Sequence, residues 1–229
     1  FFEYGNGSYG TYNSFSNAAS VHGDGDMYYL GGGILGRMEF TDTGPGHFYV
    51  EASGRMGKAY NEYDSSDLRD SRTGVRANYD SSSMYYGLHF GTGYVWKMTE
   101  HASLDLCGKY FWTRQQGDKV TLANGDPVRF KDVDSQRLRL GGRFSYAINE
   151  RVTPYIGASH EHEFDGKARA STYGYAIDSP SLRGDTGIGE FGLTLTPSAN
   201  LPLSFDLGAQ AYTGKREGVT GSLQAKLEF

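Results

Sequence analysis

The final segment of the chain, residues 218–229, alternates between small or apolar and polar side chains without a break. One face of an extended strand would carry Val219, Gly221, Leu223, Ala225, Leu227 and Phe229. The other face would carry Thr220, Ser222, Gln224, Lys226 and Glu228. Because successive side chains of a strand point to opposite faces, this pattern predicts a β-strand with one apolar and one polar face.

Earlier segments repeat this alternation with varying clarity, and together they predict ten antiparallel strands. The predicted strands cover residues 1–12, 26–40, 47–60, 83–98, 102–114, 135–148, 152–168, 187–197, 201–214 and 218–229. The segment 135–148 alternates most clearly, with Arg137, Arg139 and Arg143 on the face opposite its large apolar side chains. If this strand crosses a membrane, an arginine that faces lipid near the midplane of the bilayer costs roughly 2 to 4 kcal/mol. The arginine face must therefore contact water or form ion pairs.

The polar faces of these strands predict a charged interior. The predicted lumen-facing charges are Arg37, Glu51, Arg55, Lys109, Arg137, Arg139, Arg143, Glu161, Glu163, Glu190, Asp206, Lys226 and Glu228. Both signs occur, so a lining of ion pairs that holds the pore shape is favoured over an anion-selective filter.

The connections between the predicted strands alternate in length. The long ones are residues 13–25, 61–82, 115–134 and 169–186, and the short ones are residues 41–46, 99–101, 149–151 and 198–200. Outer-membrane barrels have short periplasmic turns and longer extracellular loops. The connections therefore favour an all-β, antiparallel transmembrane β-barrel over a soluble sandwich, with both chain ends on the periplasmic side.

Composition agrees with this interpretation. The chain of 229 residues has 33 Gly, 18 Tyr and only 6 Pro, which suits aromatic-rich strands better than helices. Its mean hydropathy of -0.55 and the lack of any run of about 18 apolar residues exclude a transmembrane helix. They do not exclude a barrel, which exposes only every second residue to lipid. A net charge of -5 gives no basic surface for nucleic acid, and the single Cys107 forbids an internal disulfide.

Two motifs that resemble ligand sites are interpreted as structural. Gly187, Gly189 and Gly192 spell the dinucleotide fingerprint, but the residues after them alternate as a strand instead of a helix. In the run 160–163 the two histidines and the two glutamates fall on opposite faces of a strand, so the four cannot converge on a metal. We therefore predict no cofactor, no metal and no catalytic residue. A membrane protease using carboxylates with His89 or His101 stays an alternative.

Several short segments together resemble the autotransporter β-domain of Gram-negative bacteria, the translocator of type V secretion. The resemblance rests on residues 153–157, 163–166, 187–193, 207–208, 212–214, 221 and 227–229, and it covers nearly the whole chain. It implies a twelve-stranded barrel, of which ten strands are visible here, preceded by a helix that threads the pore to a secreted passenger. The first two strands, the linker helix and the passenger are thus expected upstream of Phe1, and residues 1–229 are expected to form the translocator domain.

The same resemblance implies partners and an assembly signal. The expected partners are outer-membrane lipid, the barrel assembly machinery and the chain's own passenger. The last strand would be the β-signal, carried by Gly221, Leu223, Ala225, Leu227 and Phe229. The hypothesis is a non-enzymatic barrel of the Gram-negative outer membrane that enables export of its own N-terminal passenger. The alternative is a free-standing barrel that acts as a pore or adhesin through its long loops.

Overall fold

The computed structural model describes residues 1–14, 16–17, 19–41, 44–69, 73–177, 179–197 and 203–227, with the backbone alone at Asn13, Lys226 and Leu227. Every regular element in this part of the chain is a β-strand. Within it, no helix is long and apolar enough to span a membrane.

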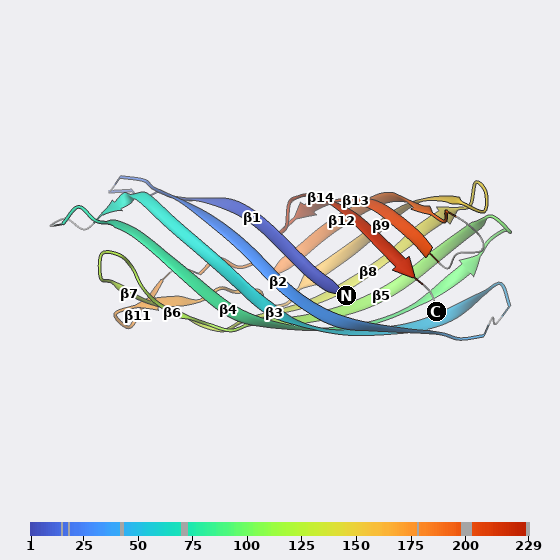
Figure 1. Cartoon of the computed structure of the whole chain (residues 1–229), viewed down its shortest axis with the longest axis horizontal. Helices are drawn as coiled ribbons and strands as arrows, with labels where there is room; N and C mark the ends of the chain where they lie inside the picture. Colours follow the sequence, from blue (N-terminus) through green and yellow to red (C-terminus); the bar gives the residue numbers. More distant parts are fainter. Residues whose placement is uncertain are drawn as a thin grey trace.

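Ten strands form one antiparallel sheet in which each strand pairs with its neighbours in chain order. They are β1 (Phe2–Asn13), β2 (Val21–Glu39), β3 (Gly46–Arg69), β4 (Arg76–Lys97), β5 (Ala102–Gln115), β8 (Val133–Tyr146), β9 (Val152–Glu163), β12 (Gly184–Leu195), β13 (Leu203–Gly214) and β14 (Gly218–Leu227). The sheet is strongly curled, and β1 and β14 are its two edges (Figure 1). The prediction of an all-β antiparallel fold is confirmed, although the described strands form an open sheet.

Four short strands form a second sheet from segments that were predicted as loops. They are β6 (Lys119–Thr121), β7 (Pro127–Phe130), β10 (Ala170–Thr172) and β11 (Tyr175–Ile177). Their order is β11-β10-β7-β6, so the connections 115–134 and 169–186 pair with one another. The backbone N–H of Ala123 donates to the carbonyl of Asn78, which attaches this small sheet to β4.

The predicted loop 61–82 is also wrong, because β3 runs on to Arg69 and β4 starts at Arg76. The extended part of this hairpin carries polar side chains on both faces, for example Glu62 and Asp64 on one and Asn61 and Ser65 on the other. Alternation between apolar and polar residues is lost there, although the hydrogen-bonded pairing continues.

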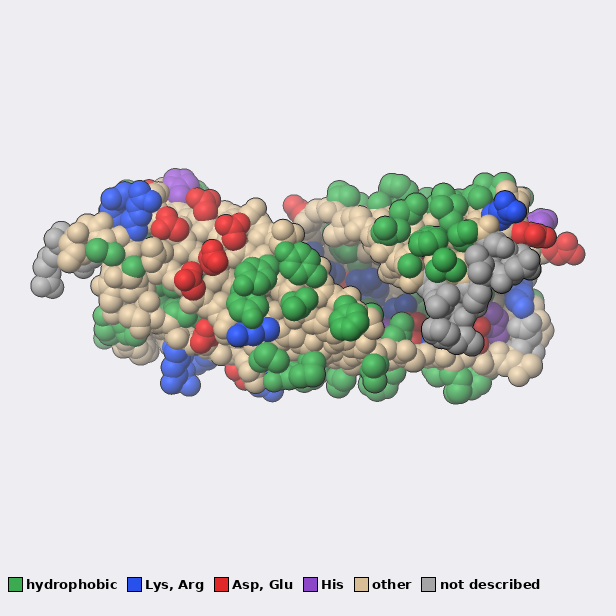
Figure 2. All heavy atoms as spheres, viewed as in Figure 1, with side chains coloured by type: hydrophobic (Ala, Val, Ile, Leu, Met, Phe, Trp, Pro, Cys, Tyr) green, Lys and Arg blue, Asp and Glu red, His purple; other side chains and the backbone are tan. Residues whose placement is uncertain are grey.

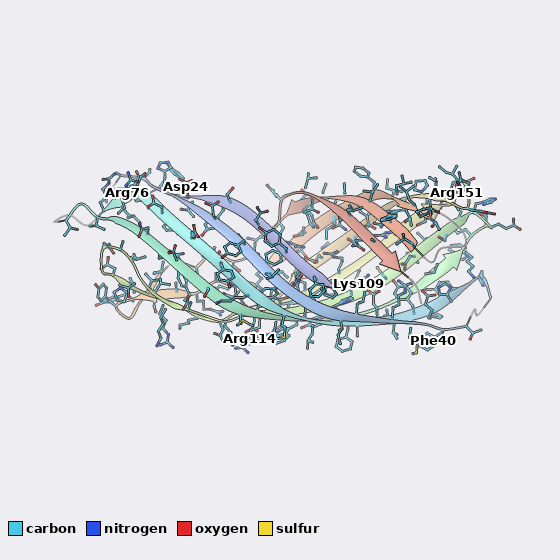
Figure 3. All side chains as sticks on the ribbon, in the orientation of Figure 1. Asp24, Phe40, Arg76, Lys109, Arg114 and Arg151 are labelled. Atoms are coloured by element: carbon cyan, nitrogen blue, oxygen red, sulfur yellow. The ribbon has the colours of Figure 1, made fainter. Side chains whose placement is uncertain are left out.

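The two ends of the sheet differ. The end with Asp24 and Arg76 carries the extended hairpin and the small sheet, and the opposite end with Phe40 and Arg151 carries the short turns (Figures 1 and 3). The long and short connections thus gather at opposite ends, in agreement with the alternation in the sequence.

Burial is inverted relative to a water-soluble protein. On the convex face large apolar side chains are exposed, including Ile34 at 80%, Phe191 at 66% and Ile156 at 63%. On the concave face Tyr49 is 0% and Glu161 only 1% exposed. Apolar side chains cover much of the outer surface in Figure 2. Exposed apolar side chains outside and polar side chains inside are the arrangement of a wall that faces lipid.

Tyrosine rings on the concave face occupy the space above glycines of adjacent strands. A Cβ added at Gly192 would overlap the ring of Tyr155, and one at Gly93 would come within 2.6 Å of the ring of Tyr49. The missing side chains let large rings lie flat against the sheet and keep the concave face tightly packed.

Candidate functional site

The polar lining of the curled sheet is the candidate functional site, and its most buried charge is Glu161 on β9. Both Nε and Nη2 of Arg139 donate to Glu161 Oε2, at 3.0 and 2.8 Å. A nitrogen of Arg137 lies 3.8 Å from the other carboxylate oxygen, and Arg216 donates to that oxygen as well. Three cations therefore surround one carboxylate that is almost fully withdrawn from solvent.

Glu163, on the same face of β9, is held mainly by neutral donors. Its carboxylate accepts hydrogen bonds from the Ser135 hydroxyl at 2.5 Å and from the Gln136 backbone N–H at 2.7 Å. Arg137 Nε lies 3.9 Å away, too far for a hydrogen bond. Glu163 thus joins β9 to β8 through the backbone as well as through charge.

A second set of contacts joins β8 to β12 and β13. Arg143 donates to both oxygens of Glu190 at 2.8 and 3.1 Å, and Gln210 donates to Glu190 Oε2 at 3.1 Å. The bidentate pair reaches across β9, which lies between β8 and β12 in the sheet. Fork-like pairs of this kind fix geometry as well as charge.

Asp206 on β13 lies on the same face but accepts from hydroxyls. Tyr155 donates to its Oδ1 at 2.9 Å, and Thr194 donates to its Oδ2 at 3.0 Å. The ring of Tyr155 also lies 4.2 Å below the guanidinium of Arg143. The two sets of contacts therefore form one network across β8, β9, β12 and β13.

Glu51 is the centre of a third cluster, on β3. Lys109 Nζ lies 2.7 Å and His89 Nε2 3.3 Å from Glu51 Oε1, and Arg37 Nη1 lies 3.8 Å from Oε2. Arg37 stacks on the ring of Tyr49 at 3.7 Å. Lys109 lies within the curl of the sheet in Figure 3. Basic side chains are visible in the hollow near the middle of the view in Figure 2.

Arg55 pairs with a residue outside the predicted set. Its Nη1 donates to Glu3 Oε2 at 3.1 Å, and the Tyr85 hydroxyl donates to Glu3 Oε1 at 2.6 Å. Arg55 also donates to Thr113 at 3.4 Å. These contacts link β1, β3, β4 and β5 on the concave face.

A cavity of about 230 Å³ lies between the Glu51 and Glu161 clusters, and Arg55, His89 and Arg137 help to line it. His89 Nε2 and Arg137 Nε are buried there, and neither makes a hydrogen bond in the described part of the chain, although each lies within ion-pair distance of a carboxylate, at 3.3 Å from Glu51 and 3.9 Å from Glu163. Such groups are costly unless something else satisfies them, so this stretch of the lining is suited to a polar guest or to water.

The predicted inward charges with described side chains share the concave face, and the structure brings most of them into three clusters. The side chain of Lys226 is not described, and Glu228 and Phe229 lie outside the described residues. Glu3 and Arg216 join the lining but were not predicted. Glu3 lies on a first strand diluted by glycine, and Arg216 lies in a tight turn where alternation gives no direction.

Of the predicted β-signal, Gly221, Leu223 and Ala225 lie on the convex side of β14, and Leu223 is 70% exposed. The outer edge of β14 has no strand beside it within the described residues. Leu227 is described by its backbone alone.

The two motifs interpreted as structural lie on strands. Gly187, Gly189 and Gly192 fall within β12, which pairs with β9 and β13. His160 and His162 lie 3.1 and 2.7 Å from Asp185 on the convex face. Across the residues that the structure describes, no group of three or more His, Cys, Asp or Glu side chains is arranged to hold a metal ion.

Comparison with known proteins adds three findings. A family model described as autotransporter beta-domain matches residues 1–208. The search of curated proteins found no match. Among solved structures, the chain is similar to the crystal structure of the transport unit of the autotransporter AIDA-I from Escherichia coli, with 16% identity and a TM-score of 0.47. That alignment covers 100% of this chain and 89% of the other.

Proposed function

Because this chain belongs to the autotransporter β-domain family, we propose that it exports an N-terminal passenger of its own polypeptide across the Gram-negative outer membrane. The family is one of transport barrels in that membrane, and its role is transport rather than catalysis. The finer proposal is that the passenger crosses the membrane along the polar concave face of this sheet.

One observation carries the proposal, namely the inversion of burial across the curled sheet. Ile156 and Phe191 are more than half exposed on the convex face, whereas Glu161 is buried on the concave face. The outer surface would be unstable in water, and the inner surface would be unstable in lipid. A wall that separates lipid from a polar interior satisfies both faces at once, and a transport barrel is such a wall.

We further propose that additional strands of the same polypeptide close the wall. β1 and β14 end the strand order, and each carries a row of backbone groups unpaired within the described residues. In lipid such groups cost several kcal/mol each, so spanning sheets close. Two strands and a pore helix from an upstream segment would complete a twelve-stranded translocator.

Assembly forms the third part of the proposal, with the barrel assembly machinery and lipid as partners. A β14 edge that lacks a neighbour offers main-chain hydrogen bonds to a docking strand, and the convex row Gly221, Leu223 and Ala225 offers side-chain selectivity. Leu227 and Phe229 are the other residues of the proposed signal.

The test is surface display from the complete reading frame that contains this chain. An epitope tag is placed in the upstream region, the protein is expressed in a Gram-negative host, and protease is added to intact cells. We expect the tag to be cleaved in wild type. We expect it to be protected when Arg143→Glu reverses one half of the Arg143–Glu190 pair, because the wall is then disrupted.

The matched control is Arg114→Glu, because Arg114 lies on the convex side and pairs with Asp132 at 3.1 Å near the loops. We expect display to remain near the wild-type level in this variant. A wild-type protein that inserts normally in the outer membrane while its tagged upstream region stays inside the cell would contradict the proposed export.

A further inference from the structure

A shallow groove on the convex face lies apart from the lining and from the proposed export route. It has a volume of about 390 Å³ and crosses β1, β2 and β3. The residues that line it include Tyr4, Asn6, Ser8, Asp26, Tyr28 and Glu62. The register places Ser8 opposite Asp26, and Asp26 opposite Glu62, so these groups form one continuous row.

The groove combines two kinds of contact surface. Tyr4 and Tyr28 are 66% and 42% exposed, and Tyr28 stacks on Tyr60 with ring centroids 4.5 Å apart. This stacking holds the ring of Tyr28 as a rigid apolar platform. Beside it, the carboxylates of Asp26 and Glu62 and the amide of Asn6 supply hydrogen-bond acceptors.

None of the polar side chains of Asn6, Ser8, Asp26 or Glu62 makes a hydrogen bond or ion pair in the part of the chain that the structure describes. Asp26 and Glu62 face each other across two strands, and no lysine or arginine lines the groove. Like charges directly opposite one another are destabilising. A guest that donates hydrogen bonds would relieve this repulsion, and a guest with a negative charge would increase it.

The groove lies where the convex face changes from apolar to polar. Along β2, Tyr28 separates the carboxylates of Asp24 and Asp26 from an apolar run that includes Ile34. Along β3, Tyr60 lies at the same level, with Lys58 4.9 Å from its ring. Tyrosines at such a boundary mark the level of lipid headgroups in membrane proteins.

We propose that this groove binds the sugar headgroup of a glycolipid, with a neutral or amino sugar rather than an acidic one. The C–H face of the sugar ring would rest on Tyr28 and Tyr4. Its hydroxyl or ammonium groups would donate to Asp26, Glu62 and Asn6. The acyl chains would lie along the apolar band that begins below Tyr28.

The experiment uses the purified full-length protein in phospholipid nanodiscs that contain equal amounts of glucosaminyl diacylglycerol, glucosyl diacylglycerol and phosphatidic acid. Lipids retained by the protein after detergent extraction are counted by native mass spectrometry. We expect each glycolipid to be retained at least about fivefold over phosphatidic acid, since an anionic headgroup is repelled by the two carboxylates. The glucosaminyl lipid should be retained most.

Two variants separate the contributions of the ring and the charges. Tyr28→Leu should reduce retention of both glycolipids by about tenfold, because the stacking platform is lost. Asp26→Asn combined with Glu62→Gln should abolish the preference for the glucosaminyl lipid and raise retention of phosphatidic acid. Tyr146→Leu and Glu100→Gln, at the opposite end of the sheet, are the matched controls and should behave as wild type.

Unchanged glycolipid retention in both groove variants would overturn the proposal. Retention of phosphatidic acid at the level of the glycolipids in wild type would overturn it as well. Binding of free glucosamine in solution without retention of either glycolipid would also contradict it, because the headgroup of a membrane lipid would then not be the ligand.

Discussion

Glu161 shows how a single buried charge organises the lining. Its carboxylate is 1% exposed and contacts Arg139, Arg137 and Arg216. Removing one partner of a buried ion pair leaves the others uncompensated, which is much more costly than losing a surface pair. Glu161 therefore ties β8, β9 and the turn after β13 together.

We predict that Glu161→Gln lowers the free energy of unfolding by about 3 kcal/mol. The measurement is urea unfolding of the detergent-solubilised protein, followed by tryptophan fluorescence. Glu150→Gln is the control, because Glu150 lies exposed in a short turn. Equal midpoints for the two variants would show that the cluster does not stabilise the wall.

The ring of Tyr155 leads to a second prediction at this scale. A Cβ at Gly192 would overlap that ring, whereas a Cβ at Gly189 on the same strand meets nothing within 4 Å. Gly192→Ala should therefore destabilise the protein by roughly 1 to 3 kcal/mol through overpacking, and Gly189→Ala should be close to neutral. The same unfolding measurement compares the two, and a larger loss at Gly189 would contradict the interlocking of Tyr155 with Gly192.

Alternation alone assigns Arg139, Arg143 and Glu190 to the polar face of their strands, and in the structure all three lie on the concave face. It does not determine which arginine pairs with which glutamate. Arg143 reaches past β9 to Glu190, a pairing set by the register of three strands. Alternation cannot assign Arg216 to the lining, because Arg216 lies in the turn between β13 and β14, where side chains do not alternate between two faces.

The sequence predicts the bounds of a strand best where one face of the strand is apolar and the other is polar. The predicted segment 102–114 differs by one residue from β5, Ala102–Gln115. The projecting parts of β3 and β4 show no alternation in the sequence, because both of their faces are polar. The small sheet of β6, β7, β10 and β11 was missed for a related reason, since its strands of 3 or 4 residues are too short to show a period.

The segment that leads into this small sheet contains a pH-sensitive contact. The Gly117 N–H donates to Asp132 at 2.9 Å, and this bond, helped by Arg114, lowers the pKa of the Asp132 carboxyl below its ordinary value. A lowered folded-state pKa means that the contact stabilises the loop above the unfolded pKa of about 3.9 and is lost as the pH falls through the folded-state value.

We therefore predict that the amide of Gly117 loses protection from hydrogen exchange below about pH 4, after correction for the intrinsic rate. Gly125 is the internal control, because its N–H donates to the Leu122 carbonyl at 2.8 Å, a group that does not titrate. Asp132→Asn should remove the pH dependence at Gly117. The same dependence in that variant would assign the effect to another group.

For the proposed β-signal we predict that Phe229→Ala reduces the amount of barrel in the outer membrane several-fold. The proposed β-signal would then lose an aromatic side chain, so the assembly machinery would bind it less well. The level is measured by immunoblot of outer-membrane fractions. Phe191→Ala, which removes a 66% exposed aromatic from the convex face of β12, is the control. Equal levels of the two variants would argue against the signal.

For the whole molecule, the curled sheet explains why a chain with a mean hydropathy of -0.55 has so much exposed apolar surface. The wall is a single β-sheet, and its large apolar side chains are concentrated on the convex side. The polar residues on the other side are buried against each other, because the wall curves around them. The apolar and the polar side chains both follow the same period of two residues along each strand.

The central claim is that the convex face contacts lipid and the concave face does not. Its most direct test places a fluorescent label on single cysteines in a Cys107→Ser background, with the protein in bilayers of brominated lipid. The positions are Ala158 and Ala209 on the convex face and their neighbours Ser159 and Gln210 on the concave face. We predict quenching at Ala158 and Ala209 and little at Ser159 and Gln210, and equal or reversed quenching of neighbours would contradict the claim.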